Sequence, residues 1–167
     1  FQYAELESKK ITRGLRFIKP ESIEINNAQD YFSALSTQGI ELDLEIRKSK
    51  ISEQVKNEME KIGADPSRLD EELLNEVTLL VEAPTAFTGS FDPEHLNLPP
   101  EVLISVMKKH QRYFPVFDLG GNLMPYFIGV RNGDTRFLDI VADGNEQVIR
   151  PRFADATFFI KEDLKFK

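Results

Sequence analysis

The chain has 167 residues, of which 41% are hydrophobic and 29% charged, a composition typical of a soluble globular domain that can bury about two thirds of its unfolded surface. It has no cysteine and only two histidines, which excludes disulfides, thiolate chemistry and the usual Cys/His zinc sites. A net charge of −7 argues against a free-standing nucleic-acid-binding protein, because such proteins are usually basic overall.

The negative charge is concentrated in the first part of the chain. From Pro100 onward ten Lys/Arg face nine Asp/Glu, a net of +1, whereas eleven Lys/Arg and nineteen Asp/Glu before Pro100 give −8. No run of ~18 apolar residues that could cross a membrane is present, and the opening FQYAELESKK lacks the apolar core of a signal peptide. We therefore expect an intracellular protein that does not enter a membrane.

The first half predicts an extended segment and then helices. Residues 8–25 are extended with a basic edge, and their most β-rich part is Ile23 to Ile25. Apolar residues with helical spacing then predict an amphipathic helix between Asn27 as N-cap and Gly39 as stop. A narrow apolar stripe predicts a surface helix over residues 47–62.

The strongest helix signal in this half begins at Asp70, which can cap a packing helix whose first turn holds two glutamates. Pro84 is expected to end that helix, and Thr85 to Phe91 then predict a strand. The expected buried face consists of Leu73, Leu74, Val77, Leu80 and Val81.

A helix with proline tolerated in its first turn begins at Pro100 and should place His110 beside an apolar stripe. Continuous apolar runs on both sides of LGG then predict a hairpin near residues 112–131, with both of its faces largely covered. A three-residue loop would set Asp118 opposite Asn122 and Pro115 opposite Pro125.

The last part, from Asp139 on, predicts two helical pieces separated at Pro151, because the residue before a proline avoids the helical region. No internal repeat or low-complexity linker is present. The fold class is therefore α+β over residues 1–167 as a single domain, with mixed helices packed on a mostly antiparallel sheet that includes the hairpin.

Signatures of catalysis are absent from the sequence. It contains no GxGxxG or GxxxxGK[ST] phosphate loop and no GxSxG nucleophile elbow, and we assign no catalytic or metal-binding residue. A partly buried structural role for His110 is favoured over a role as base or ligand. Paired carboxylates such as Glu71 and Glu72 are best explained as solvated helix faces.

Basic residues gather in the second half, where they could hold RNA phosphates beside an aromatic side chain that could stack on a base. A solvated surface, or ion pairs with a partner domain, explains the same residues equally well. The candidate tRNA contacts are Lys108, Lys109, Arg112, Tyr113 and Arg131, with Arg150 and Arg152 as second choices.

Three long blocks resemble a known family. LPPEVLISVMKKHQRYFPVFD, LMPYFIGVRNG and GNEQVIRPRFADATFFIKEDLK are similar, in that order, to the beta subunit of the bacterial heterotetrameric glycyl-tRNA synthetase, and TRGLRF and LLNEVTLLVEAPTAFTGSFD upstream follow the same order. The resemblance covers about nine tenths of the chain and is more specific than any short motif. It departs at Lys9 to Ile11 and at Leu15, where the family usually has a histidine, so a role of that histidine does not carry over.

The resemblance implies a cytoplasmic bacterial enzyme, a class II aminoacyl-tRNA synthetase of alpha2beta2 composition. Such a glycine–tRNA ligase joins glycine to tRNA(Gly) with ATP and Mg²⁺, and the family's activation site lies in the alpha subunit. The chain is then an excised inner segment of the beta subunit, with no cofactor of its own. A fold-level analogy extends to the editing module of the phenylalanyl-tRNA synthetase beta subunit, but a shared fold does not by itself carry a function.

Three hypotheses follow for this segment. The first is a non-catalytic module that helps to hold tRNA, and the second is a structural module that docks onto the alpha subunit or the remaining beta-subunit domains. The third is a hydrolytic pocket around His110 that edits mischarged tRNA.

Overall fold

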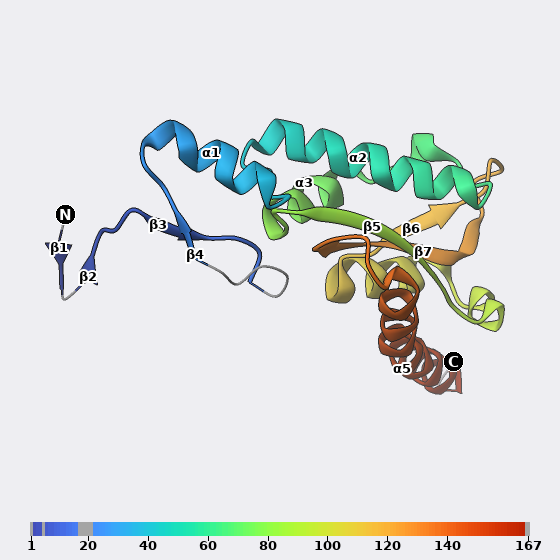
Figure 1. Ribbon diagram of the computed structural model, residues 1–167. Coiled ribbons are helices and arrows are strands. Elements are labelled where there is room, and N and C mark those ends of the chain that lie inside the picture. The colour runs from blue at the N-terminus through green and yellow to red at the C-terminus, as the bar shows by residue number, and fades with distance from the viewer. Residues whose placement is uncertain (1, 5, 17–21, 166–167) are drawn as a thin grey trace.

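The computed structural model describes residues 2–4, 6–16 and 22–165, and these form an α+β fold, as predicted. Its main sheet is antiparallel, with strand order β5-β7-β6, and consists of β5 (Pro84–Ser90), β6 (Phe114–Phe117) and β7 (Leu123–Asn132). Helices α2 (Leu44–Lys61) and α3 (Glu71–Leu80) cover one face of this sheet, and α4 (Pro100–Val106) and α5 (Leu138–Lys165) cover the other (Figure 1).

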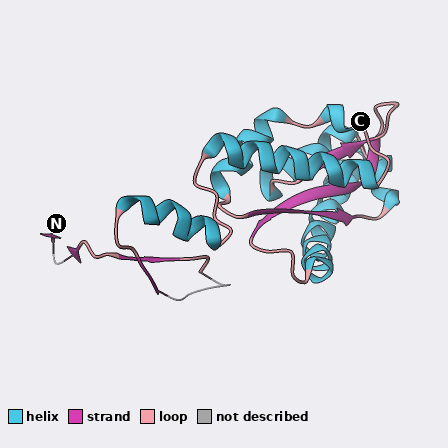
Figure 2. Ribbon diagram, turned by 45° about the horizontal axis from the view of Figure 1, so that its top comes forward, coloured by secondary structure: helices cyan, strands magenta, loops and turns pink. Residues whose placement is uncertain are grey.

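The N-terminal part contains two small antiparallel pairs, β1 (Gln2–Tyr3) with β2 (Leu6–Glu7) and β3 (Ile11–Arg13) with β4 (Ser22–Glu24). Both pairs lie apart from the main sheet, with β3 and β4 beside α1 (Ala28–Thr37) and β1 and β2 farther out near the N-terminus (Figure 1 and Figure 2). The predicted extended segment is confirmed where it is described, and its residues 17–21 lie outside the described residues.

Helix α1 (Ala28–Thr37) begins and ends as predicted. The Asn27 side chain accepts a hydrogen bond from the Asp30 N–H at 3.0 Å, and Gly39 follows the helix with φ +83°, a conformation that favours glycine. Leu15, one of the two places where the resemblance is expected to depart, is buried in a small cluster with Leu35 and Ala83.

Helix α2 (Leu44–Lys61) begins three residues before the predicted Arg47, because the Asp43 carboxylate caps it by accepting from the N–H groups of Glu45 and Ile46. The predicted surface helix is confirmed, because only one narrow stripe of α2 is buried and its other side chains are exposed or half-buried. Its apolar stripe, which includes Ile51 and Val55, is fully buried against α3 and β5.

After the short 3-10 turn η1 (Pro66–Arg68), α3 (Glu71–Leu80) is capped by Asp70, as predicted. Leu80 does not belong to its buried face and is 60% exposed. The helix ends at Leu80, well before Pro84, and Val81 is extended and buried. Because the helix stops between Leu80 and Val81, these two residues do not share the buried face that the periodicity predicted.

The hairpin of β6 and β7 is present, and the Asp118 N–H donates to the Asn122 carbonyl at 2.9 Å, as predicted. The pairing of the two prolines was wrong, since Pro115 faces Phe127. Between this pair and the pair Phe117 and Leu123, β6 advances two residues and β7 four, so β7 bulges there. The bulge turns the Pro125 carbonyl toward β5, where it accepts the Phe91 N–H at 3.1 Å.

Both faces of the hairpin are covered, as predicted. Phe114 and Val116 contribute to the core under α2 and α3, whereas Tyr113 and Phe127 contribute to the core under α4 and α5. Alternating side chains of a strand point to opposite faces, which explains the continuous apolar runs in the sequence.

Two short turns flank α4 (Pro100–Val106) in the layer that it forms with α5. The 3-10 turn η2 (Pro93–Asn97) precedes α4, and the π-helical turn η3 (Met107–Gln111) follows it. The division of the last segment into two helices was wrong, because α5 (Leu138–Lys165) is one helix with Pro151 inside it. A proline inside a helix costs about 3 kcal/mol, and the fully buried Ile149 and Phe153 on either side of it supply packing that offsets this cost.

The free edge of β5 is closed by side chains. Gln54 accepts the Ala86 N–H at 2.8 Å and donates to the Pro84 carbonyl at 3.1 Å, and Glu146 accepts the Ser90 N–H at 2.7 Å. Unpaired strand edges invite pairing with other chains, so α2 and α5 protect this edge as well as packing on the sheet.

Candidate nucleic-acid interface

The predicted basic residues begin on the η3 turn, where the backbone is irregular. The α4 helix widens into a π-helical turn, and the Tyr113 N–H donates to the Met107 carbonyl at 3.1 Å. Arg112 then adopts the left-handed region with φ +58°, which is uncommon for a residue other than glycine. These two irregularities determine which way the side chains from Lys108 to Tyr113 point.

Two of the predicted cations are paired with carboxylates of the α3 segment. The Lys108 ammonium lies 2.5 Å from the Asp70 carboxylate, and the Arg112 guanidinium pairs with Glu76 and also donates to the Lys109 carbonyl. A phosphate group would have to compete with these carboxylates. The two cations therefore fasten η3 to α3 and balance its negative charge.

Three other predicted cations are exposed and make no ion pair within the described ranges. Lys109 lies on η3, and Arg150 and Arg152 lie near the middle of α5. Helices α4 and α5 pack on each other through the core beneath them, so all three belong to the same helical layer.

Tyr113 is buried in this core, which leaves little of its ring accessible for the base contact that the sequence suggested. Its ring stacks on Phe127 with 4.3 Å between the ring centroids, and its hydroxyl donates to the Asn145 side chain. Burial raises the pKa of Tyr113 to about 12. The residue packs the core, and a base cannot reach the face of its ring that Phe127 covers.

His110 does not pack against the apolar stripe, in contrast to the structural role favoured above. It is exposed, because residues in a π-helical turn advance by less than the α-helical angle, and the position three residues after the buried Met107 leaves the core side. Within the described residues it has no hydrogen-bond partner that could orient it as a general base.

Arg131 lies at a small cavity between α3, η3, β7 and α5, with a volume of about 200 Å³. Its guanidinium donates to the Arg136 carbonyl at 2.9 Å and lies 3.9 Å from the Asp134 carboxylate. Arg112 and Tyr113 reach the same cavity. Gln111 and Asn145 also line it, and sequence reasoning missed both as site residues. The sequence offers one signal for such a role, which is the amide side chain of Asn145 within the apolar stripe of a predicted helix.

The whole chain, residues 1–167, matches the family model described as glycyl-tRNA synthetase beta subunit. It is 47% identical over 165 residues to the glycine–tRNA ligase beta subunit of Listeria monocytogenes serotype 4a (strain HCC23). The chain belongs to this family. The beta subunits of Clostridioides difficile (strain 630) and Halothermothrix orenii are 46% and 44% identical to it. In each case 99% of this chain is covered but only 24% of the relative, so the chain spans about a quarter of their length.

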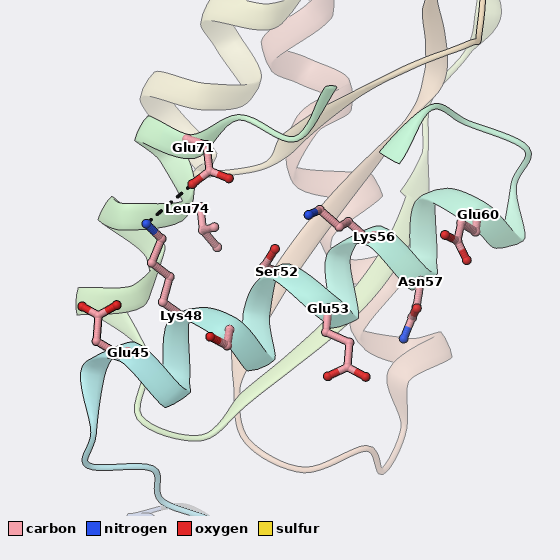
Figure 3. A pocket seen from close by; sticks show the side chains of 10 residues that line it. Glu45, Lys48, Ser52, Glu53, Lys56, Asn57, Glu60, Glu71 and Leu74 are labelled. Carbon is pink, nitrogen blue, oxygen red and sulfur yellow. Dashed lines mark ion pairs between the residues drawn. The ribbon is translucent and has the colours of Figure 1, made fainter. Parts of the chain in front are cut away.

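This segment of a glycyl-tRNA synthetase beta subunit also has a larger, polar hollow of about 570 Å³ on α2 (Figure 3). Lys48, Lys56 and several glutamates line it, and Lys48 pairs with Glu71 of α3 at 3.5 Å. Four glutamates outnumber the two lysines here, so the hollow has the character of a solvated, acidic helix face rather than of a phosphate site.

Two kinds of feature are absent from the part of the family segment that the structure describes, namely a membrane-spanning helix and a cluster of metal ligands. No helix there is both long and apolar enough to cross a bilayer. No group of three or more His, Asp or Glu side chains there could hold a metal ion.

The Asp70–Lys108 pair makes a testable contribution to stability. Burial would raise the pKa of the Asp70 carboxyl, but the hydrogen bonds from Lys108 and the Leu73 N–H outweigh it, so the pKa is lowered on folding. A carboxyl whose pKa is lowered on folding stabilises the fold at pH values above its unfolded-state pKa. This contribution is lost as the pH falls through the folded-state pKa. Asp70→Asn keeps a good N-cap but removes the charge.

We expect urea unfolding of Asp70→Asn to show a loss of about 0.5–1 kcal/mol at pH 7, a value reduced by solvent screening, and a smaller difference from wild type at pH 3. Lys161→Gln, at an exposed cation without an ion pair among the described residues, is the control and should change neither value. An equal loss at both pH values would show that the charge of Asp70 does not matter.

Proposed function

We propose that this chain is a non-catalytic module that helps to hold tRNA(Gly) within a bacterial glycine–tRNA ligase. Membership of the beta-subunit family supports the parent activity, the ATP-dependent joining of glycine to its tRNA. In this proposal the parent is a cytoplasmic class II enzyme of alpha2beta2 composition. ATP and Mg²⁺ bind in its alpha subunit, and this segment contacts the tRNA, the alpha subunit and the other beta-subunit domains.

The unpaired cations of the α4–α5 layer carry this proposal. Lys109, Arg150 and Arg152 are exposed and are not neutralised by any carboxylate within the described residues, so a phosphate can approach them without displacing a partner. They become the first candidates for phosphate contacts. Arg112 and Arg131 come second because each already has a protein partner, and Lys108 is left out because Asp70 holds it.

The proposal is tested by replacing Lys109, Arg150 and Arg152 with alanine in the assembled enzyme and titrating tRNA(Gly) by filter binding at several salt concentrations. Each lost phosphate contact should lower the slope of log K against log salt by about 0.7–0.9. Three contacts therefore predict a slope that is smaller by about 2–3, with weaker binding at low salt.

The matched control removes three cations that are already paired within the chain, Lys50, Lys61 and Lys165, and so changes the net charge equally. The control should retain the wild-type slope. An unchanged slope in the first variant would show that its three cations do not contact phosphates.

Exposed aromatic residues favour docking as a second candidate function. Phe158 and Phe159 are 60% and 64% exposed on the part of α5 that extends beyond the sheet (Figure 1). Because the chain spans a quarter of its relatives' length, other domains of the same subunit are available to cover them. Under this alternative the triple-alanine variant binds tRNA normally, and any defect appears as altered assembly in sedimentation.

A further inference from the structure

The 200 Å³ cavity beside η3 combines apolar walls with polar groups that converge on it. Val81, Val130 and Val141 contribute apolar surface from three different elements, and Phe87 lies among them. The cavity is smaller than the ~300–1,000 Å³ pockets of drug-sized ligands. Its size and its walls therefore suit a single ring rather than an extended molecule.

The charged side chains that line this cavity are both arginines, Arg112 and Arg131. Each has a carboxylate outside the lining, since Arg112 pairs with Glu76 and Arg131 lies 3.9 Å from Asp134, and an incoming anion would share the arginines with these carboxylates. Arg112 also donates to the Lys109 carbonyl, and Arg131 donates to the Arg136 carbonyl. A guanidinium has five N–H donors, so both arginines are positioned by the protein and keep donors for an anion.

Amide groups supply the remaining polar surface. The Gln111 side chain has no hydrogen-bond partner among the described residues, and Asn145 uses one oxygen lone pair and one N–H on Tyr113 and Val141, which leaves further capacity. The π-helical turn and the left-handed Arg112 place Gln111 and Arg112 at the cavity. Both kinds of irregularity often occur at functional sites.

We propose that this cavity takes one unstacked nucleotide of bound tRNA, with its base between the apolar walls and its phosphate held by Arg112 and Arg131. Gln111 and Asn145 would read the edge of the base. Proteins recognise RNA mainly through single-stranded nucleotides whose bases can be turned out. This inference rests on the proposed tRNA-holding function and adds a specific nucleotide site to the phosphate contacts of the α4–α5 surface.

The test is photolabelling of the assembled enzyme with 4-thiouridine 5′-monophosphate, followed by mass-spectrometric mapping of the labelled peptides. A pyrimidine nucleotide is used because the proposed ATP site of the alpha subunit would take adenine nucleotides. Label is expected in peptides containing residues 111–113 or 130–145, and tRNA(Gly) should suppress it. Free glycine should not suppress it, because a carboxylate without a ring leaves the apolar walls empty.

Two variants alter the cavity in different ways. Arg131→Gln should weaken nucleotide binding about tenfold, because a hydrogen bond to a charged group is lost. Val141→Phe should block labelling by filling the cavity. The control is Arg136→Gln, whose side chain is exposed beside the cavity without lining it, and whose backbone carbonyl still positions Arg131.

Three outcomes would each overturn the proposal. The label could lie outside these peptides, it could remain unchanged in both Arg131→Gln and Val141→Phe, or tRNA could fail to suppress it. Failure here is distinguishable from failure of the proposed function. Suppose that the cavity is not labelled but that the variant of Lys109, Arg150 and Arg152 shows the smaller salt slope. Then only the proposed nucleotide site is wrong, and the proposed function stands. If tRNA suppresses cavity labelling but that variant binds tRNA normally, the phosphate contacts are wrong and the cavity stands.

Discussion

Gly89→Ala is expected to lower the free energy of unfolding by about 1–3 kcal/mol, the cost of forcing a methyl group into a packed core. A Cβ at this position would lie 2.7 Å from Cε1 of Phe127, which is fully buried. The two residues face each other across β5 and β7, and Phe87 covers Gly129 in the same way two positions farther along the strands. Each phenylalanine thus lies flat over the glycine of the partner strand.

Urea unfolding of the 167-residue chain measures this effect as a shift in midpoint without a change in slope. Gly144→Ala is the matched control, because Gly144 lies in α5 with nothing within 4 Å of an added Cβ. It should stabilise the chain by about 0.5–1 kcal/mol. The double variant Gly89→Ala with Phe127→Leu should be less destabilised than the sum of its single changes. Additive losses would show that the methyl group and the ring do not compete for space.

Arg47→Met is expected to destabilise the chain by about 2–5 kcal/mol, because each buried polar group left unpaired costs about 1–3 kcal/mol. Arg47 is buried on α2 and has no carboxylate partner among the residues that the structure describes. Its guanidinium instead donates to the Glu41 carbonyl at 2.8 and 2.5 Å and to the Thr78 carbonyl at 3.1 Å. These bonds join the segment before α2 to the last turn of α3.

Chemical denaturation of the same chain tests this prediction against Lys50→Met. Lys50 lies on the same helix but forms an exposed pair with the Glu41 carboxylate, so its loss should cost less than about 1 kcal/mol. Arg47→Lys should recover little, because one ammonium cannot reach both carbonyls as the planar guanidinium does. Equal effects of Arg47→Met and Lys50→Met would rule out a structural role of the buried hydrogen bonds.

Local signals predicted most elements of the fold. Asn27 and Asp70 cap the helices that they were expected to cap, because an N-cap depends only on residues within one turn. The hairpin and its covered faces followed from continuous apolar runs around a glycine turn. Long-range geometry was not predictable in the same way. The bulge in β7 and the continuity of α5 through Pro151 both depend on packing with distant segments.

Sequence reasoning identified the residue types of the candidate interface but could not separate their roles. Lys108 and Lys109 are neighbours with the same chemistry, yet one pairs with Asp70 and the other is exposed. Tyr113 looked available for stacking and is buried against Phe127. The partners that decide these roles are 32 to 38 residues away in the chain or on the opposite strand.

The sequence by itself determined the family and the class of fold, because long ordered blocks and the periodicity of apolar residues are properties of the chain alone. Only the tertiary structure decided which cations are neutralised and which have no ion pair within the described part of the chain. It alone also showed that Gln111, Arg112, Arg131 and Asn145 meet at one cavity. The physical reason is that charge pairing and cavity formation depend on the approach of α3, β7 and α5 to a π-helical turn. No local pattern in the sequence records that approach.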